Sequence, residues 1–239
     1  MQERYLGDSH DYLKYALLRA LHAAGFGPLG LAWYLTHERA VEAAGNADGE
    51  KRHHLSARGW AQLDPELHAA LHAFAAPEDR SIEAFEASGI LPAGTVFTAR
   101  NPPVDPPARI QWWRAVQDDC APARTVFSDP DNGFIVPSAP RRRQPKYATY
   151  GETLSLYRAG KTTVTIQFAR QCDPVKRARD IRARLTETAP DCAGLPVLRG
   201  RTAPNILFIF LAPPPRHAAL NEALRALVSR APARLELIA

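Results

Sequence analysis

Residues that can do chemistry gather in two short segments of the chain. Asp129-Pro130-Asp131-Asn132 comes directly after an apolar run, and such a turn holds carboxylates and a backbone carbonyl rigidly at the end of a strand. Near the N-terminus, Asp8, Asp11, Lys14 and Tyr15 share the opening turns of an expected helix, whose free amides also suit an anion. Each segment also has a purely structural interpretation: an Asx-type turn for the first, and a solvated helix face for the second.

Further polar residues are expected around the same turn. Thr36-His37 ends the first predicted strand, and in an open parallel sheet ligands collect beyond the carboxyl ends of the strands. The expected substrate contacts are Lys146, Tyr147, Glu152 and Gln167, which adjacent strand ends can bring to one cleft, together with Arg141 and Arg142. These arginines lie in a basic, proline-rich loop that either grips phosphates or serves only as a solubilising segment.

The elements that must position these residues alternate along the chain. A first helix starts at Asp8 or Ser9 and stops before Gly25. Expected strands are 29–36, 95–98, 125–128, 162–168, 195–199, 205–211 and 233–238, and further expected helices are 61–75, 79–88, 109–118, 147–159, 174–188 and 216–230. This alternation predicts a three-layer, Rossmann-like α/β fold, in which a mostly parallel sheet has helices on both faces. We expect a single domain over residues 1–239, with a loop and helical insertion at about 37–90.

Composition limits the class of protein. The 239 residues include 30 basic and 25 acidic side chains, a net charge of +5, and 46% are hydrophobic. A wholly disordered chain is therefore excluded, and a polyanionic partner is permitted but not required. The N-terminus lacks the apolar stretch of a signal peptide, no run of 18 apolar residues predicts a membrane span, and three separated cysteines form no disulfide framework. We therefore expect a cytoplasmic protein without a membrane partner.

Three segments, in order along the chain, resemble a known family. Gly7-Asp8-Ser9-His10-Asp11-Tyr12-Leu13-Lys14-Tyr15 is similar to the opening motif G-N-H-A-D-x-L-K-H of the large-subunit ribosomal RNA adenine-N6 methyltransferases of the J type. Tyr34-Leu35-Thr36-His37 resembles the L-D-T-H of that family, and Phe127-Ser128-Asp129-Pro130-Asp131-Asn132 resembles its catalytic I-D-P-P-Y. The Gly-Asp…Lys-Tyr and Asp-Pro-Asp-Asn-Gly blocks are also similar to those of uncharacterised bacterial proteins.

The resemblance implies a class I S-adenosylmethionine fold and methyl transfer to an exocyclic amino group. On this basis the cofactor contacts are Asp8, Asp11, Lys14, Tyr15, Thr36 and His37, and Asp129 with the Pro130 carbonyl accepts hydrogen bonds from the amino group being methylated. The chain departs from the family at Glu38-Arg39-Ala40-Val41, where the family has a glycine-rich turn. It departs again at Asp131 and Asn132, which replace a proline and the aromatic residue that stacks on a flipped base.

Two other functions stay open beside a methyltransferase-like protein acting on RNA, DNA or another amino-bearing substrate. Asp129, Asp131 and Asn132, with Asp8 and Asp11 facing them, would also make an oxygen-rich site for Mg²⁺ or Mn²⁺ in a phosphoester hydrolase or nuclease. A non-catalytic RNA-binding relic of the fold would use the positive charge and residues 141–143. The methyltransferase interpretation requires the first helix, the tip of the first strand and the acidic turn to meet at one hollow.

Overall fold

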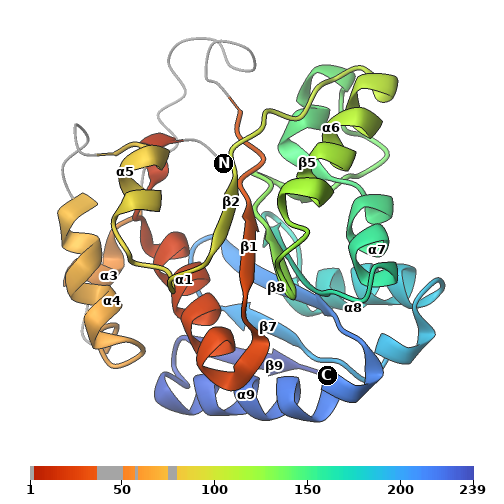
Figure 1. Cartoon of the computed structure of the whole chain (residues 1–239). Helices are drawn as coiled ribbons and strands as arrows, with labels where there is room; N and C mark the ends of the chain where they lie inside the picture. Colours follow the sequence, from red (N-terminus) through yellow and green to blue (C-terminus); the bar gives the residue numbers. More distant parts are fainter. Residues whose placement is uncertain (1–2, 37–50, 57–58, 75–79) are drawn as a thin grey trace.

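The computed structural model describes residues 3–36, 51–56, 59–74 and 80–239 (Figure 1). A seven-stranded sheet with the strand order β2-β1-β3-β6-β8-β7-β9 lies at its centre. Its strands are β1 (Leu29–Ala32), β2 (Val96–Thr98), β3 (Thr125–Ser128), β6 (Thr162–Ala169), β7 (Val197–Gly200), β8 (Asn205–Leu211) and β9 (Leu235–Ile238). A separate two-stranded sheet pairs β4 (Gly133–Phe134) with β5 (Tyr147–Ala148).

The strands of the central sheet run in two directions. β2, β1, β3 and β6 pair in parallel, whereas β8 pairs antiparallel with both β6 and β7, and β7 pairs antiparallel with β9. The expected α/β fold is confirmed, but the sheet is mixed, and only its β2-β1-β3-β6 half is parallel. Residues 201–204 explain why β8 runs antiparallel to β7. So short a segment joins two strands only as a hairpin, because a parallel crossover needs about a dozen residues or more.

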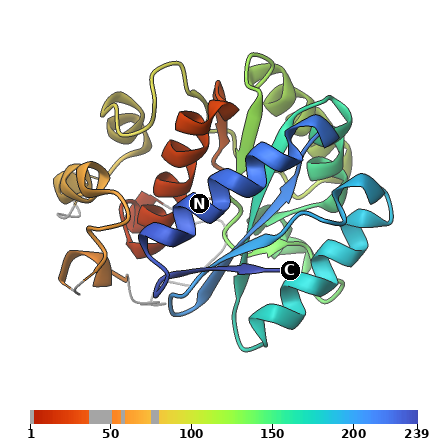
Figure 2. The same ribbon diagram turned by 90° about the horizontal axis from the view of Figure 1, so that it is seen from below.

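Helices cover both faces of the central sheet (Figures 1 and 2). α6, α7 and α8 lie on one face; α1 and α9 pack together on the other, where α3 and α4 contact α1. The helices are α1 (Ser9–Leu21), α3 (His53–Ser56), α4 (Pro65–Ala70), α5 (Ile82–Ala87), α6 (Pro106–Asp119), α7 (Tyr150–Arg158), α8 (Pro174–Thr186) and α9 (His217–Arg230). Short helical turns complete the described chain: η1 (Glu3–Tyr5), η2 (His22–Phe26), η3 (Leu71–Phe74), η5 (Arg141–Lys146), η6 (Pro190–Cys192) and η7 (Pro214–Arg216).

Side chains of a strand point alternately to the two faces of the sheet, so β1 and β3 each contribute to two hydrophobic clusters. Ala32 and Val126 share a cluster with Trp112 of α6. Their neighbours Leu31 and Phe127 belong to the larger cluster that includes the buried face of α1. Packing on both faces therefore fixes β1 and β3, and with them the residues that follow each strand.

Two of the differences between expected and observed element bounds affect the site. The strand expected over 29–36 ends at Ala32, and Tyr34 has a φ of 50°, which an extended strand does not adopt. The helix expected over 147–159 begins only at Tyr150, because residues 147–148 pair with β4. Thr149 and Glu152 then form a capping box that starts the helix.

The expected insertion at about 37–90 contains α3, α4 and α5. The side chain of Asp64 caps α4 and also accepts a hydrogen bond from Arg19 Nε of α1 at 2.7 Å. His37, for which a cofactor contact is expected, lies outside the described residues. Within the described ranges, no helix combines the length and the apolar character needed to cross a membrane.

The strand order creates a switch point in the sheet. β1 lies between β2 and β3, so the chain leaves β1 towards one side of the sheet and later returns to its other side. In open α/β sheets, ligands bind beyond the carboxyl ends of the strands at such a point. The residues after β1 and β3 are therefore the first place to look for a site.

Candidate functional site

The start of α1 is built by its own sequence. The Asp8 carboxylate caps the helix and accepts hydrogen bonds from the backbone N–H groups of His10 at 2.8 Å and Asp11 at 2.9 Å. Gly7, just before the cap, has a φ of 75°, a conformation that glycine adopts without strain. This cap sets the rotation of the helix, so that Asp11 and Lys14 face the interior of the protein.

Lys14 joins α1 to the acidic turn after β3. Its Nζ atom lies 2.9 Å from Asp11 Oδ1, 2.9 Å from Asp129 Oδ1 and 3.0 Å from Asp129 Oδ2. The exposed fractions of Asp11, Lys14 and Asp129 are only 1%, 4% and 1%. The backbone N–H of Asp129 donates to the carbonyl of Ala32 at 2.9 Å, which fixes the turn against β1. Two segments more than a hundred residues apart, both expected to be functional, are therefore in direct contact.

Burial and neighbouring charges shift the pKa values of this cluster. Burial raises the pKa of Asp11 to about 6; Lys14 opposes this rise, and the charges of Asp8 and Asp129 reinforce it. Burial alone would lower the pKa of Lys14, but the adjacent carboxylates of Asp11 and Asp129 outweigh it and raise the value. Lys14 is therefore an ammonium at neutral pH. Tyr15 donates its hydroxyl hydrogen to Asp11 Oδ2 at 3.1 Å, and burial raises the pKa of this tyrosine well above its usual value.

His10 connects the start of α1 to the hairpin between β7 and β8. Its Nδ1 atom lies 3.2 Å from Asp8 Oδ2, and its Nε2 atom lies 3.0 Å from the carbonyl oxygen of Pro204. Each ring nitrogen of His10 therefore faces an oxygen that can accept a hydrogen bond. The rings of His10 and Phe168 make an edge contact, with centroids 5.0 Å apart, which connects the start of α1 to the end of β6.

The acidic turn also meets the chain that follows β1. Thr36 donates its hydroxyl hydrogen to Asp131 Oδ2 at 2.7 Å, and Lys146 Nζ lies 3.9 Å from the same oxygen. Lys14 and Thr36 therefore bring the first helix and the segment after β1 into contact with the acidic turn, whereas His37, expected at the same hollow, lies outside the described residues.

Gln167 holds this turn in place from β6. Its Oε1 atom accepts the backbone N–H of Phe134 at 2.9 Å, and its Nε2 atom donates to the carbonyl of Asn132 at 3.1 Å. The side chain of Gln167 thus fixes the backbone of the turn, and it is not among the residues that line the pocket described below.

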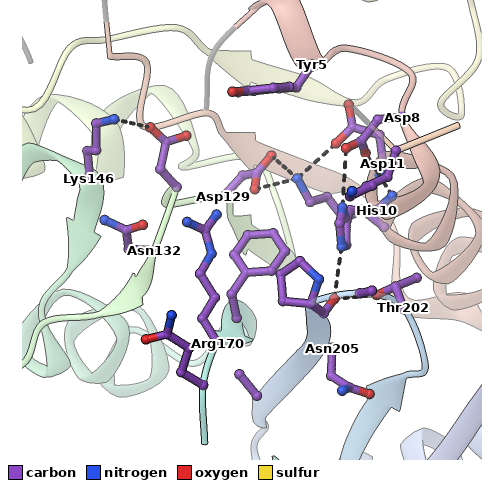
Figure 3. Close-up of a pocket in the computed structure, with 18 of the residues that line it drawn as sticks. Tyr5, Asp8, His10, Asp11, Asp129, Asn132, Lys146, Arg170, Thr202 and Asn205 are labelled. Atoms are coloured by element: carbon purple, nitrogen blue, oxygen red, sulfur yellow. Dashed lines mark hydrogen bonds and ion pairs between the residues drawn. The ribbon is translucent and has the colours of Figure 1, made fainter. Parts of the chain in front are cut away.

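A pocket of about 650 Å³ opens above these residues (Figure 3). Asp8, His10 and Asp11 lie on one side of it and Asn132 and Lys146 on the other, with Asp129 between them. Six parts of the described chain line it: η1, the start of α1, the segment before α3, the acidic turn with η5, the end of β6, and the β7–β8 hairpin. The lining residues are Tyr5, Asp8, His10, Asp11, Lys14, Lys51, Asp129, Asp131, Asn132, Arg143, Lys146, Phe168, Ala169, Arg170, Gln171, Thr202, Ala203, Pro204 and Asn205.

Several residues expected at the site are not among those that line the pocket. Tyr15 lies behind Asp11, and Thr36 supports Asp131. Pro130, Tyr147, Arg141 and Arg142 are likewise absent from the lining, whereas the neighbouring Arg143 is present. Glu152 has a structural role instead, because its carboxylate binds Arg109 Nε at 2.6 Å and the hydroxyl of Tyr34 at 3.0 Å.

Sequence reasoning missed the contribution of β6 and the β7–β8 hairpin. The rule that ligands collect at strand ends indicated Gln167, but this side chain is bound to the backbone of the turn, and the residues of β6 that line the pocket are Phe168 and Ala169. Thr202 and Asn205 carry no motif, and they reach the pocket only because the hairpin returns to the same edge of the sheet.

The carboxylates between α1 and the acidic turn, which were expected to hold a metal ion in a hydrolase, already bind the amine of a lysine. Lys14 Nζ lies between the carboxylates of Asp11 and Asp129. Among the residues that the structure describes, no group of three or more histidine, cysteine or acidic side chains is placed to hold a metal ion.

Comparison of the chain with protein-family models, with curated proteins and with solved structures finds no match in any of the three. The function proposed below therefore rests on the geometry of the site and on the sequence motifs.

Proposed function

We propose that this protein binds S-adenosylmethionine in the pocket and transfers its methyl group to an amino group of a substrate, as a class I methyltransferase-like protein. The observation that carries the proposal is the contact of Lys14 with Asp129. It joins the two motifs that resemble the adenine-N6 methyltransferases, at the edge of the sheet where β1 and β3 form the switch point.

The residues present fit this cofactor. The inner wall of the pocket carries the carboxylates of Asp8, Asp11 and Asp129 against one ammonium, Lys14, and the imidazole of His10. The sulfonium and ammonium of S-adenosylmethionine can face these carboxylates, and its own carboxylate can face the cationic side chains that also line the pocket. A pocket of about 650 Å³ is within the range typical of cofactor sites.

The chemistry of the bound cofactor is to present an activated methyl group. Asp129 would accept a hydrogen bond from the substrate amino group, which raises electron density on the nitrogen. Because methyl transfer needs little acid–base chemistry, the contribution of the chain lies in positioning the amino group in a site shielded from water.

Cationic side chains favour a polyanionic substrate such as RNA or DNA. Lys51, Arg143 and Arg170 line the pocket, and none of them forms an ion pair with a described carboxylate. Phosphate groups of a nucleic acid are the natural partners of such side chains. The ring of Phe168, near the guanidinium of Arg170 at 5.4 Å, offers an aromatic surface that the acidic turn itself lacks.

The test combines calorimetry with an activity assay. Isothermal titration should show binding of S-adenosylmethionine to the wild type. Asp129→Asn should bind it within about threefold of the wild type but transfer tritiated methyl to mixed-sequence RNA or single-stranded DNA at least about 100-fold more slowly. Asp180→Asn, at an exposed aspartate on α8, is the matched control and should behave as the wild type. Absence of cofactor binding by the wild type would reject the proposal.

The metal-dependent hydrolase is the alternative that the same sample can test. Cleavage of RNA or DNA that requires Mg²⁺ and stops with EDTA would support it, whereas methyl transfer should be indifferent to the chelator.

A further inference from the structure

We propose that Lys14 is a positioning residue that acts through Asp129, and that it does not contact the cofactor. Its ammonium fixes the orientation of the carboxylate that receives the substrate amino group. The inference rests on the proposed function, because that function gives Asp129 its role. It differs from the family resemblance, which implies that Lys14 lies against the cofactor.

The hydrogen-bonding capacity of Lys14 carries this inference. An ammonium has three N–H donors and no acceptor. Three carboxylate oxygens surround it within 3.0 Å: Asp11 Oδ1, Asp129 Oδ1 and Asp129 Oδ2. All three donors therefore have partners inside the protein. Because the side chain is only 4% exposed, a ligand contact would require Lys14 to give up one of these partners.

Asp11 holds the lysine from behind. While its Oδ1 atom receives Lys14, its Oδ2 atom accepts the backbone N–H of Gly7 at 3.0 Å and the hydroxyl of Tyr15 at 3.1 Å. Asp11 is thus fixed by the backbone and by the first helix. A chain of contacts runs from that helix through Asp11 and Lys14 to Asp129, and it ends at the pocket.

Asp129 is fixed from its other side by the sheet. Its backbone N–H donates to Ala32 at the end of β1, and its side chain meets Lys14 through both oxygens. An ammonium shared by both oxygens limits the rotation of the carboxylate about the Cβ–Cγ bond. Loss of Lys14 should therefore impair the reaction more than cofactor binding.

The test compares cofactor affinity with turnover in Lys14→Met and Lys14→Arg. Calorimetry with S-adenosylmethionine gives the affinity, and transfer of tritiated methyl to mixed-sequence RNA and single-stranded DNA gives the turnover at saturating cofactor. We expect Lys14→Met to bind within about threefold of the wild type and to turn over at least about 100-fold more slowly. Lys14→Arg should turn over about tenfold faster than Lys14→Met. Lys176→Met, at an exposed lysine of α8, should match the wild type. Affinity weakened more than about tenfold with near-normal turnover would overturn the proposal.

A second measurement needs no cofactor and separates this inference from the proposed function. Removing one partner of a buried ion pair is strongly destabilising, so Lys14→Met should lower the unfolding midpoint by about 10 °C. Adding Asp129→Asn should recover several degrees, because it removes a carboxylate left without its partner. Strictly additive effects would show that Lys14 does not act through Asp129. If Lys14→Met does not fold, Lys14→Arg with and without Asp129→Asn provides the same cycle. If the wild type binds no cofactor, the proposed function fails while this coupling is still decided.

Discussion

At the scale of single residues, Asp11, Lys14 and Asp129 form a buried group of alternating charge. Taking each of these charges out of water is costly, and their mutual contacts offset that cost only while all three are present. The raised pKa of Asp11, about 6, reflects burial together with the nearby Asp8 and Asp129. The group is therefore sensitive to any change that removes one of its members.

A second buried residue, His54, gives the stability a pH dependence of known sign. Its Nδ1 atom lies 3.0 Å from Ser9 Oγ, and burial lowers its pKa from 6.5 to about 4. The unfolded chain binds a proton on this ring near pH 6.5, whereas the folded protein resists it until about pH 4. The contribution of His54 to the free energy of unfolding is therefore complete above pH 6.5, and it is lost as the pH falls towards 4.

Urea unfolding at several pH values between 7.5 and 4.5 measures this effect in the wild type and in His54→Gln. The stability difference between the two should shrink as the pH falls, with a slope of at most about 1.4 kcal/mol per pH unit. The stability contribution of Asp11 has the opposite pH dependence. Because its pKa is raised from 3.8 to about 6, this contribution is present below pH 3.8 and is lost as the pH rises through 6. Asp11 is present in both proteins, so its contribution cancels in the stability difference between the wild type and His54→Gln. A constant difference across the range would contradict the assignment.

At the scale of elements, the acidic turn depends on the glycine that begins β4. Gly133 has a φ of 94°, and a Cβ atom there would lie 2.8 Å from the Cα atom of Gln167 and closer still to its side-chain amide. Gly133→Ala should therefore displace Gln167, which holds the turn, and destabilise the protein by more than about 2 kcal/mol, since left-handed backbone alone costs about 1–2 kcal/mol.

Gly160 supplies the matched control for this variant. It has a similar φ of 77°, but a Cβ atom there would meet nothing within 4 Å. Gly160→Ala should therefore show only the backbone cost, about 1–2 kcal/mol, in chemical denaturation. Equal losses for the two variants would show that the packing of Gln167 against the turn is unimportant.

The elements also show which parts of the fold were readable in the sequence. The strand at 125–128 was predicted with its observed bounds, because a short apolar run ends sharply at the Asp-Pro turn. The start of α7 was not, because pairing of Tyr147–Ala148 with Gly133–Phe134 is a tertiary contact that overrides local helix propensity. The direction of β8 follows from the length of segment 201–204, but that length was not used in predicting the sheet.

At the scale of the whole molecule, the site forms where distant segments meet at one edge of the sheet. Motifs allowed Asp11, Lys14 and Asp129 to be predicted as neighbours, since strand ends and a preceding helix share that edge. The lining by Phe168 and Thr202 was not predictable in the same way. It depends on the binding of Gln167 to the turn and on the return of the hairpin, neither of which leaves a local signature.

The central claim is that the pocket between the start of α1 and the acidic turn receives S-adenosylmethionine. The most direct measurement is a crystal structure of the protein soaked with this cofactor. The account predicts the adenosyl group and sulfonium in the pocket beside Asp8, Asp11 and Asp129, with Lys14 still bound to both aspartates. A pocket without the cofactor at saturating concentration, or a metal ion held there by Asp129 and Asp131, would contradict it.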